Sequence, residues 1–158
     1  MIIHFICGGN TYRSRLAEAY LNSKHLSNIK SISSGVRATP NESGPISWYA
    51  QRILQNEKLV PFESLSWQQT TKEILKKGDF TIFMLQEPYD YCRNKLGFMQ
   101  KNYEIWDIKD LDEFLLSSTR MRPVTEMEKI RASEETFTMI KQKIDDLIKR
   151  FSKKNNKF

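Results

Sequence analysis

Near its start the chain reads Ile2-Ile3-His4-Phe5-Ile6-Cys7-Gly8-Gly9-Asn10-Thr11-Tyr12-Arg13-Ser14. The mostly apolar run at 2–6 predicts a short buried strand that leads into Cys7. Two glycines follow, and apolar residues beyond Ser14 recur with the spacing of a helix. Five residues separate Cys7 from Arg13, which suits a loop that wraps one oxyanion of the size of phosphate. The stretch therefore predicts a strand, an anion-binding loop and a helix in succession.

The predicted loop would make Cys7 reactive. Successive backbone N–H groups point at one place in such a loop, and the N-terminus of the following helix adds positive potential. Both effects favour an anion, so we expect Cys7 to be a thiolate nucleophile facing a phosphate. Arg13 suits the same site because its planar guanidinium binds two oxygens at once, and Gly8 and Gly9 supply a permissive backbone. The competing interpretation is an inert cysteine buried at the end of a core strand.

Two polar residues of the loop have predicted supporting roles. Asn10 tolerates a left-handed backbone, so we expect it to stabilise the loop through side-chain hydrogen bonds. Ser14 is expected to donate a hydrogen bond from its hydroxyl to the Cys7 thiolate. The same serine is also a suitable cap for the following helix, and both roles can hold together.

Periodicity and turn residues predict that strands and helices alternate along the chain. Strands are expected at 2–6, 29–33, 79–85 and 103–106, and helices at 14–23, from Pro45 to Leu54, at 68–77 and at 88–96. A last helix carries Ile130, Phe137, Ile140, Ile144, Leu147 and Phe151 on one stripe, and loops are expected at 36–44 and 107–122. This alternation is typical of a single α/β domain with a four-stranded parallel sheet, helices on both faces and the phosphate-binding loop after the first strand.

Sheets of this kind bind ligands at the carboxyl ends of their strands. Cys7 follows the first predicted strand, and Asp107 and Asp110 follow the fourth, so we expect them at one edge of the sheet. Their proximity would matter because displacing phosphate from an ester requires a proton for the leaving oxygen. Asp112 and Glu113 are further candidates for this acid.

The composition indicates one domain, which we assign to 1–152, with a basic tail at 153–158. Five of the last ten residues are Lys or Arg and none is acidic, so the remainder is close to neutral despite a net charge of +6. We therefore expect no nucleic-acid partner. The absence of a membrane-length apolar run and of a disulfide framework favours a cytoplasmic protein without a membrane partner. We expect a monomer and no metal, because His4 and His25 fit no ligand pattern.

The residues from Cys7 to Ser14, followed by Leu16-Ala17-Glu18-Ala19, resemble the signature loop of the low-molecular-weight protein tyrosine phosphatases. Ser33-Ser34-Gly35 is similar to that family's Ser-Ala-Gly after the second strand, and 79–85 is similar to its third-strand segment. Asp107-Ile108-Lys109-Asp110-Leu111 resembles the segment that normally ends in Asp-Pro and carries the general acid. The resemblance covers the whole chain.

The resemblance implies a protein tyrosine phosphatase that hydrolyses phosphomonoesters, in a phosphorylated protein or a small molecule, through a phosphocysteine intermediate. Cys7 would attack phosphorus, Arg13 would hold the phosphate oxygens and Asp110 would be the general acid, without a cofactor. The residues expected to bind the substrate are Gly8, Gly9, Asn10, Thr11, Tyr12, Ser14, Trp48 and Tyr49, of which the last two would form an aromatic wall.

Three departures from the family pattern leave alternatives open. Leu111 stands where the family has proline after the acid, so Asp107 remains a second candidate for the general acid. Thr11 stands where tyrosine-directed relatives have a bulkier aliphatic residue, and it resembles the bacterial branch that removes phosphate from arginine. Tyr12 stands where many relatives have a second cysteine that can form a disulfide with the oxidised nucleophile.

Two further functions compete with phosphatase activity. An arsenate reductase-like activity would use the same loop cysteine but requires more cysteines, and Cys92 is the only other one, which disfavours this function. A phosphate-binding module with little turnover is the non-enzymatic alternative, suggested by Leu111 in the acid-bearing segment. Hydrolysis of p-nitrophenyl phosphate, and arsenate turnover with and without added thiols, would separate the three.

Overall fold

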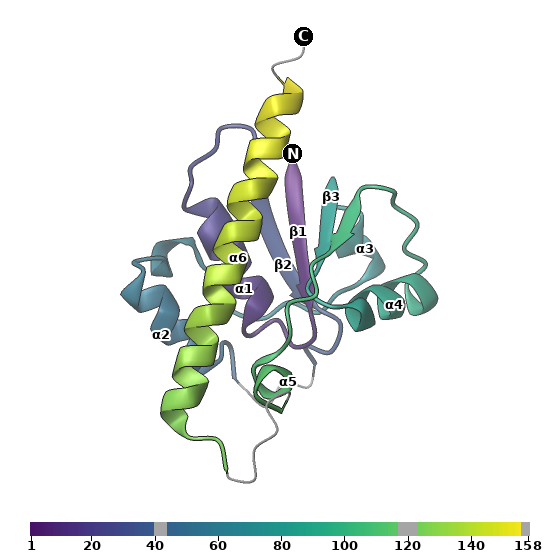
Figure 1. The fold of residues 1–158 in the computed structure, drawn as a ribbon. Helices are drawn as coiled ribbons and strands as arrows, with labels where there is room; N and C mark the ends of the chain where they lie inside the picture. The colour runs from purple at the N-terminus through teal and green to yellow at the C-terminus, as the bar shows by residue number, and fades with distance from the viewer. Residues whose placement is uncertain (40–43, 117–122, 156–158) are drawn as a thin grey trace.

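A sheet of four parallel strands lies at the centre of the described residues, which are 1–39, 44–116 and 123–155 of this computed structural model. The strands are β1 (Ile2–Cys7), β2 (Lys30–Gly35), β3 (Phe80–Phe83) and β4 (Tyr103–Ile105). Their order across the sheet is β2-β1-β3-β4 (Figure 1). The predicted fold class is confirmed.

Helices connect the strands and cover both faces of the sheet. They are α1 (Arg13–Asn22), α2 (Trp48–Asn56), the 3-10 helix η1 (Val60–Phe62), α3 (Lys72–Leu75), α4 (Gln86–Lys95), α5 (Leu111–Leu116) and α6 (Glu126–Asn155). In Figure 1 the long helix α6 crosses the front of the sheet, with α1 close to it.

Each face of the sheet has its own apolar core, because successive strand residues point to opposite sides. Ile3 and Phe5 of β1 belong to a buried cluster with residues of α1, α2 and α6. Ile6 belongs to a second cluster with Leu75 of α3 and Cys92 of α4. The predicted stripe on the last helix contributes to the first cluster, with Phe137, Ile140, Ile144 and Leu147 buried and Phe151 packed against them. These two cores fix the strand ends that carry the loop described below.

The helix predicted at 68–77 is shorter in the structure, where α3 covers only Lys72–Leu75. The backbone of the preceding residues pairs with the end of β2 instead. Gly35 donates to the carbonyl of Gln68 at 2.9 Å, and Thr70 donates to the carbonyl of Gly35 at 2.8 Å. Long-range pairing therefore overrides the local helical pattern.

The helix predicted from Pro45 begins three residues later, at Trp48. Ser47 is its N-cap, with an extended backbone and a side-chain oxygen that accepts a hydrogen bond from the N–H of Ala50 at 3.3 Å. A serine cap satisfies a helix N–H that otherwise has no partner in the first turn. The start of α2 is consequently fixed by Ser47.

The loop predicted at 107–122 contains the short helix α5, so that prediction was wrong for 111–116. Asp110 precedes the helix, and its Oδ1 accepts a hydrogen bond from the N–H of Leu111 at 2.8 Å. Leu111 is buried, and Leu115 packs against the same core one helical turn later. An acidic residue before an i, i+4 apolar pair is a recognisable helix start. Residues 117–122 of the predicted loop, and 40–43 of the loop at 36–44, lie outside the described residues.

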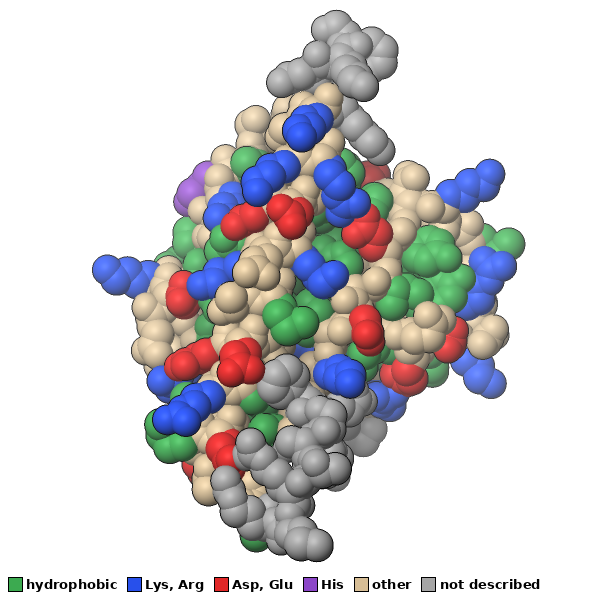
Figure 2. Space-filling view, viewed as in Figure 1, with side chains coloured by type: hydrophobic (Ala, Val, Ile, Leu, Met, Phe, Trp, Pro, Cys, Tyr) green, Lys and Arg blue, Asp and Glu red, His purple; other side chains and the backbone are tan. Residues whose placement is uncertain are grey.

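Charged side chains of both signs are interspersed on the face shown in Figure 2. Ion pairs of the molecule include Arg150 with Glu104 at 2.6 Å and Lys149 with Asp146 at 3.3 Å. Helix α6 continues to Asn155, so it includes the start of the predicted tail at 153–158, and the division into domain and tail stays a prediction. Among the described helices, none has the length and apolar content that crossing a membrane requires.

Candidate active site

Cys7 is the last residue of β1, and it opens a loop that returns to the N-terminus of α1 at Arg13. Its side chain is buried, with Sγ 3.0 Å from the hydroxyl oxygen of Ser14. The backbone N–H of Asn10 donates a second hydrogen bond to the sulfur at 3.3 Å. The sulfur therefore lies inside the loop with two hydrogen-bonding neighbours.

Asn10 has the left-handed backbone that the sequence predicts, with φ of 55°. Its side-chain amide donates to the hydroxyl oxygens of Ser14 and Ser33, both at 2.9 Å, and its Oδ1 accepts from the N–H of Gln68 at 2.7 Å. These bonds join the loop to β2 and to the segment before α3. Gly8 and Gly9 are not among the residues with positive φ, so the left-handed position of the loop is the asparagine.

A glycine at the end of β2 allows the loop to lie close to the sheet. A Cβ atom added to Gly35 would lie 2.4 Å from the carbonyl oxygen of Gly8 and 2.6 Å from the N of Asn10. Both atoms belong to backbone and cannot move away as a flexible side chain would. Any side chain at Gly35 would therefore displace the loop, which explains why a glycine is required there.

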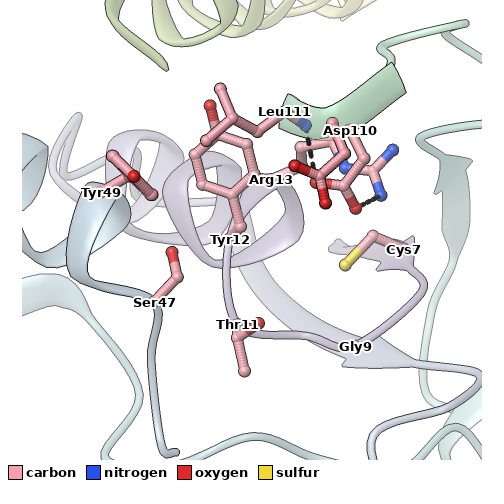
Figure 3. A pocket seen from close by; sticks show the side chains of 10 residues that line it. Cys7, Gly9, Thr11, Tyr12, Arg13, Ser47, Tyr49, Asp110 and Leu111 are labelled. Carbon is pink, nitrogen blue, oxygen red and sulfur yellow. Dashed lines mark hydrogen bonds and ion pairs between the residues drawn. The ribbon is translucent and has the colours of Figure 1, made fainter. Parts of the chain in front are cut away.

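The loop borders a pocket of about 310 Å³ at the carboxyl ends of the strands (Figure 3). Its lining residues are Cys7, Gly9, Thr11, Tyr12, Arg13, Ser47, Tyr49, Asp110, Leu111 and Asp112. In Figure 3 the Cys7 sulfur points into the pocket beneath Arg13 and Asp110, with Ser47 and Tyr49 across from it. Gly8, Asn10, Ser14 and Trp48, which were also expected to bind substrate, are not lining residues.

Arg13 is buried and uses its two terminal nitrogens within the site. Nη1 donates to the carbonyl oxygen of Ile108 at 2.8 Å, and Nη2 forms an ion pair with Asp110 at 2.5 Å. Its Nε is buried and has no hydrogen-bond partner among the described residues. A buried donor without a partner is costly, so this N–H is available for an oxyanion that enters the loop.

The two candidate acids differ in position. Asp110 lines the pocket, and its side chain is 48% exposed while it pairs with Arg13. Asp107 is exposed, has a positive φ of 53°, and does not line the pocket. The geometry therefore favours Asp110 over Asp107 as the group that can deliver a proton into the pocket. Of the other two candidates, Asp112 lines the pocket, and the side chain of Glu113 lies outside the described part of the chain.

Only one of the two expected wall aromatics lines the pocket. The Tyr49 hydroxyl donates to Glu126 of α6 at 2.7 Å, and burial together with that carboxylate raises the pKa of Tyr49. Trp48 is 59% exposed and contacts Tyr49 edge-on, with ring centroids 5.2 Å apart. Ser47, which was not singled out in the sequence, lines the pocket because it caps the same helix.

Tyr12 and Cys92 have buried side chains with different surroundings. The Tyr12 hydroxyl lies beside Thr136 of α6, and burial raises its pKa. Cys92 lies in the core between α4 and the sheet, away from the pocket lining, and burial raises the pKa of its thiol to about 12. A buried thiol of this kind is poorly suited to exchange with Cys7.

The sequence matches the family described as low molecular weight phosphotyrosine protein phosphatase over residues 2–157. The fold is similar to YfkJ from Bacillus subtilis, with a TM-score of 0.71 and 24% identity over 98% of this chain and 96% of that chain. It is also similar to a low molecular weight protein tyrosine phosphatase from Bacillus subtilis, with a TM-score of 0.66 and 24% identity over 94% of this chain and 98% of that chain. For the YwlE arginine phosphatase from Geobacillus stearothermophilus, the TM-score is 0.65 and the identity is 22% over 94% of each chain. No curated protein sequence matches the chain.

Proposed function

Because this chain belongs to the low molecular weight phosphotyrosine protein phosphatase family, whose members hydrolyse phosphomonoesters, we propose that Cys7 is its nucleophile and forms a phosphocysteine intermediate. One observation carries the proposal: the Cys7 thiol, the Arg13 guanidinium and the Asp110 carboxyl line the same pocket. A nucleophile, an oxyanion-binding cation and a proton donor are the groups that phosphoryl transfer to a thiol requires.

In the first step the Cys7 thiolate attacks phosphorus in line with the ester oxygen. A sulfur–phosphorus bond forms and the phosphorus–oxygen ester bond breaks, while Asp110 gives its proton to the departing oxygen. The loop N–H groups and the guanidinium of Arg13 hold the other phosphate oxygens as charge develops on them. The hydrogen bond between Ser14 and the Cys7 sulfur supports the thiolate before attack.

Arg13 and Asp110 are ion-paired in the structure, so substrate binding must change their partnership. A phosphate dianion in the loop would compete for the guanidinium of Arg13, beginning at its unpaired Nε. Asp110 would then interact less with the guanidinium of Arg13, and the phosphate would be a new anionic neighbour. Both changes favour uptake of a proton by Asp110. Substrate binding would thereby favour the protonated form of Asp110, which the departing oxygen requires.

In the second step a water molecule attacks the phosphocysteine. Asp110, now a carboxylate, takes a proton from that water, the sulfur–phosphorus bond breaks, and the thiolate of Cys7 is restored as phosphate leaves. The same carboxyl therefore serves as acid and then as base. No redox change occurs in either step, and the buried position of Cys92 gives no support to an arsenate reductase-like thiol relay.

The proposal is tested by hydrolysis of p-nitrophenyl phosphate with wild type and Cys7→Ser. We expect turnover by wild type and a loss of at least about a thousandfold in the variant, because serine without a base is a poor nucleophile. The variant should still bind vanadate or phosphate, since the loop N–H groups and Arg13 remain. Activity within tenfold of wild type would reject Cys7 as the nucleophile, and a wild type that binds phosphate without turnover would indicate a binding module.

For the substrate we propose phosphotyrosine first. Tyr12, Tyr49 and Leu111 line the pocket, and their aromatic and apolar side chains suit a phenyl ring. Phosphoarginine is the second candidate, favoured by the hydroxyl of Thr11 and the carboxylates of Asp110 and Asp112 at the same pocket. These groups would attract a guanidinium, and an aromatic wall accepts one by cation–π contact.

The two substrates are distinguished by kcat/KM for matched phosphotyrosine and phosphoarginine peptides, measured for wild type and Thr11→Ile. Isoleucine would remove the hydroxyl and narrow the pocket, so we expect the ratio to shift towards phosphotyrosine by about tenfold. A ratio that is the same in both proteins would show that Thr11 does not select the substrate.

A further inference from the structure

Arg15 is the largest fully buried side chain among the described residues, and the proposed chemistry gives it no role. It lies in the first turn of α1, two residues after Arg13. Burying a guanidinium is costly unless its N–H groups and charge are matched by partners. The hydrogen-bond and ion-pair partners of Arg15 therefore indicate the role of its side chain.

The guanidinium contacts carbonyl oxygens from three segments that are far apart in sequence. Nη1 lies 3.0 Å from the carbonyl oxygen of Pro45 and 3.5 Å from that of Asn10, and Nη2 donates to the carbonyl oxygen of Ser64. Asn10 belongs to the phosphate loop, Pro45 to the turn before α2, and Ser64 to the segment after η1. One planar fork thus joins the loop to two neighbouring segments.

The turn at Pro45 leads directly to the far wall of the pocket. Two residues later, the N–H of Ser47 donates to the carbonyl oxygen of Thr11 at 2.9 Å, and Tyr49 follows in the first turn of α2. Among the described residues, two links join the loop to this wall: the backbone hydrogen bond from Ser47 and the side chain of Arg15. Arg15 does not line the pocket, so it can be changed without altering a lining residue.

The charge of Arg15 is matched locally. Glu63 lies 3.9 Å from Nη2, and Glu18, Glu63 and Cys7 act against the burial that lowers the pKa of Arg15. Burial raises the pKa of Glu18, which accepts hydrogen bonds from Ser33 and Ser64. A lysine at this position would keep the positive charge, but its ammonium could not reproduce the planar set of contacts to separate carbonyls.

We propose that Arg15 is a positioning residue that holds the wall carrying Ser47 and Tyr49 against the phosphate loop. It thereby sets the affinity for the part of the substrate beyond the phosphate. The proposal rests on the proposed function only in that this pocket receives a phosphate group with an organic substituent. Loss of the Arg15 contacts should loosen the wall and leave the loop, with its own hydrogen bonds through Asn10, able to bind phosphate.

The test uses binding rather than turnover, so that it is independent of the chemistry at Cys7. Affinities for inorganic phosphate and for benzylphosphonate are measured by calorimetry in three proteins. All three carry Cys7→Ser, and position 15 is arginine in the first, Arg15→Lys in the second and Arg15→Gln in the third. We expect either substitution to weaken benzylphosphonate binding by about tenfold and phosphate binding by less than about threefold. In the active enzyme, KM for an aryl phosphate should rise with little change in kcat.

Two control variants sharpen this result. Arg52→Lys alters an ion pair between α2 and Glu134 on the outer side of the wall, and both affinities should be unchanged. Glu63→Gln removes the nearest opposite charge and should also leave the ratio of the two affinities unchanged. Thermal melting verifies that each variant is folded at the assay temperature.

An unchanged affinity ratio in the folded Arg15 variants would overturn the proposal. Equal weakening of phosphate and benzylphosphonate would also overturn it, because Arg15 would then act on the loop and not on the wall. Failure of the proposed function has a different signature: the Cys7→Ser protein with Arg15 intact would bind neither ligand, or the wild type would not hydrolyse a phosphomonoester.

Discussion

The phosphate loop and the segment 107–112 face each other across the pocket, but they are held in different ways. On the loop side, Asn10, Ser14 and Ser33 are buried, and the side-chain amide of Asn10 donates to both serine hydroxyls. On the other side, Asp110 is half exposed and is held by Arg13 and by the start of α5. The loop is held by its own hydrogen bonds, whereas Asp110, the proposed acid, is paired with a guanidinium for which a bound phosphate would compete.

This difference suggests a division of labour in the site. The buried loop provides fixed donors for a phosphate, which is the kind of preorganisation that stabilises a transition state. The exposed acid can change its partner and its proton without disturbing the core. Substitutions on the two sides should therefore differ in size and in character.

The largest effect in the loop, apart from loss of the nucleophile, should come from Arg13→Lys. An ammonium cannot make the two-oxygen contact of a guanidinium, and it cannot keep the bonds to Ile108 and Asp110 at the same time. We expect kcat/KM for p-nitrophenyl phosphate to fall by about a thousandfold, and inhibition by phosphate and vanadate to weaken in parallel. Unchanged inhibition constants would contradict a role for Arg13 in binding the oxyanion.

A smaller loss is expected on the acid side. Asp110→Asn should slow the first step about a hundredfold for substrates with poor leaving groups, with much less effect on the first release of p-nitrophenol from p-nitrophenyl phosphate. Asp107→Asn is the matched control, because Asp107 does not line the pocket.

If Asp107→Asn slowed substrates with poor leaving groups and Asp110→Asn did not, the acid would be assigned to the wrong residue. The comparison between the two sides of the pocket would still hold, since both aspartates belong to the segment 107–112. Only the position of the proton donor would change.

The two regions also differ in how far the sequence predicts them. Cys7, Asn10 and Ser14 lie within eight residues of one another, so the spacing of residue types is enough to predict the loop and the contacts inside it. The parallel sheet follows from apolar periodicity in the same way. The helix predicted at 68–77 is shorter in the structure, and the loop predicted at 107–122 was wrong for 111–116, because pairing with Gly35 and packing of Leu111 against the core involve residues distant in sequence.

The wall of the pocket was also only partly predictable from the sequence. Trp48 and Tyr49 are adjacent in sequence, and only Tyr49 lines the pocket, because Ser47 determines where α2 begins. Arg15 has no sequence signal that reveals its partners, since Pro45 and Ser64 contribute backbone carbonyls that any residue possesses.

Behind the loop, His4 should make stability depend on pH. Its ring is fully buried, Nε2 lies 2.7 Å from the hydroxyl of Ser34, and burial lowers its pKa from 6.5 to about 3. Below pH 6.5 the unfolded chain therefore binds a proton that the folded chain excludes, so this contribution to stability is complete above pH 6.5 and is lost as the pH falls towards 3.

The measurement is the free energy of unfolding at pH 7.5 and pH 5 for wild type and His4→Gln. Wild type should lose about 2 kcal/mol more than the variant over this interval, a value that follows from the two pKa values of His4. Equal losses in both proteins would mean that His4 is protonated in the folded state or accessible to water. Comparing two proteins removes the contribution of Glu18, whose raised pKa acts in the opposite direction.

The smallest effect should come from the wall. Tyr49→Ala removes a pocket-lining ring and should raise KM for an aryl phosphate by about fivefold, with little change in kcat. Trp48→Ala removes an exposed ring outside the lining and should change KM by less than about twofold. The reverse order of these effects would show that the substrate rests on Trp48 and that the wall lies elsewhere.

The most direct test of a thiolate nucleophile in a preformed loop is to observe the phosphoryl group on the protein. Asp110→Asn should release the first p-nitrophenol in a burst equal to the amount of enzyme and then turn over slowly, because the second step lacks its base. Quenched during that phase, the protein should carry one phosphoryl group on Cys7, identified by mass spectrometry of its peptides. A protein that turns over without a burst and with an unmodified Cys7 would contradict the covalent mechanism.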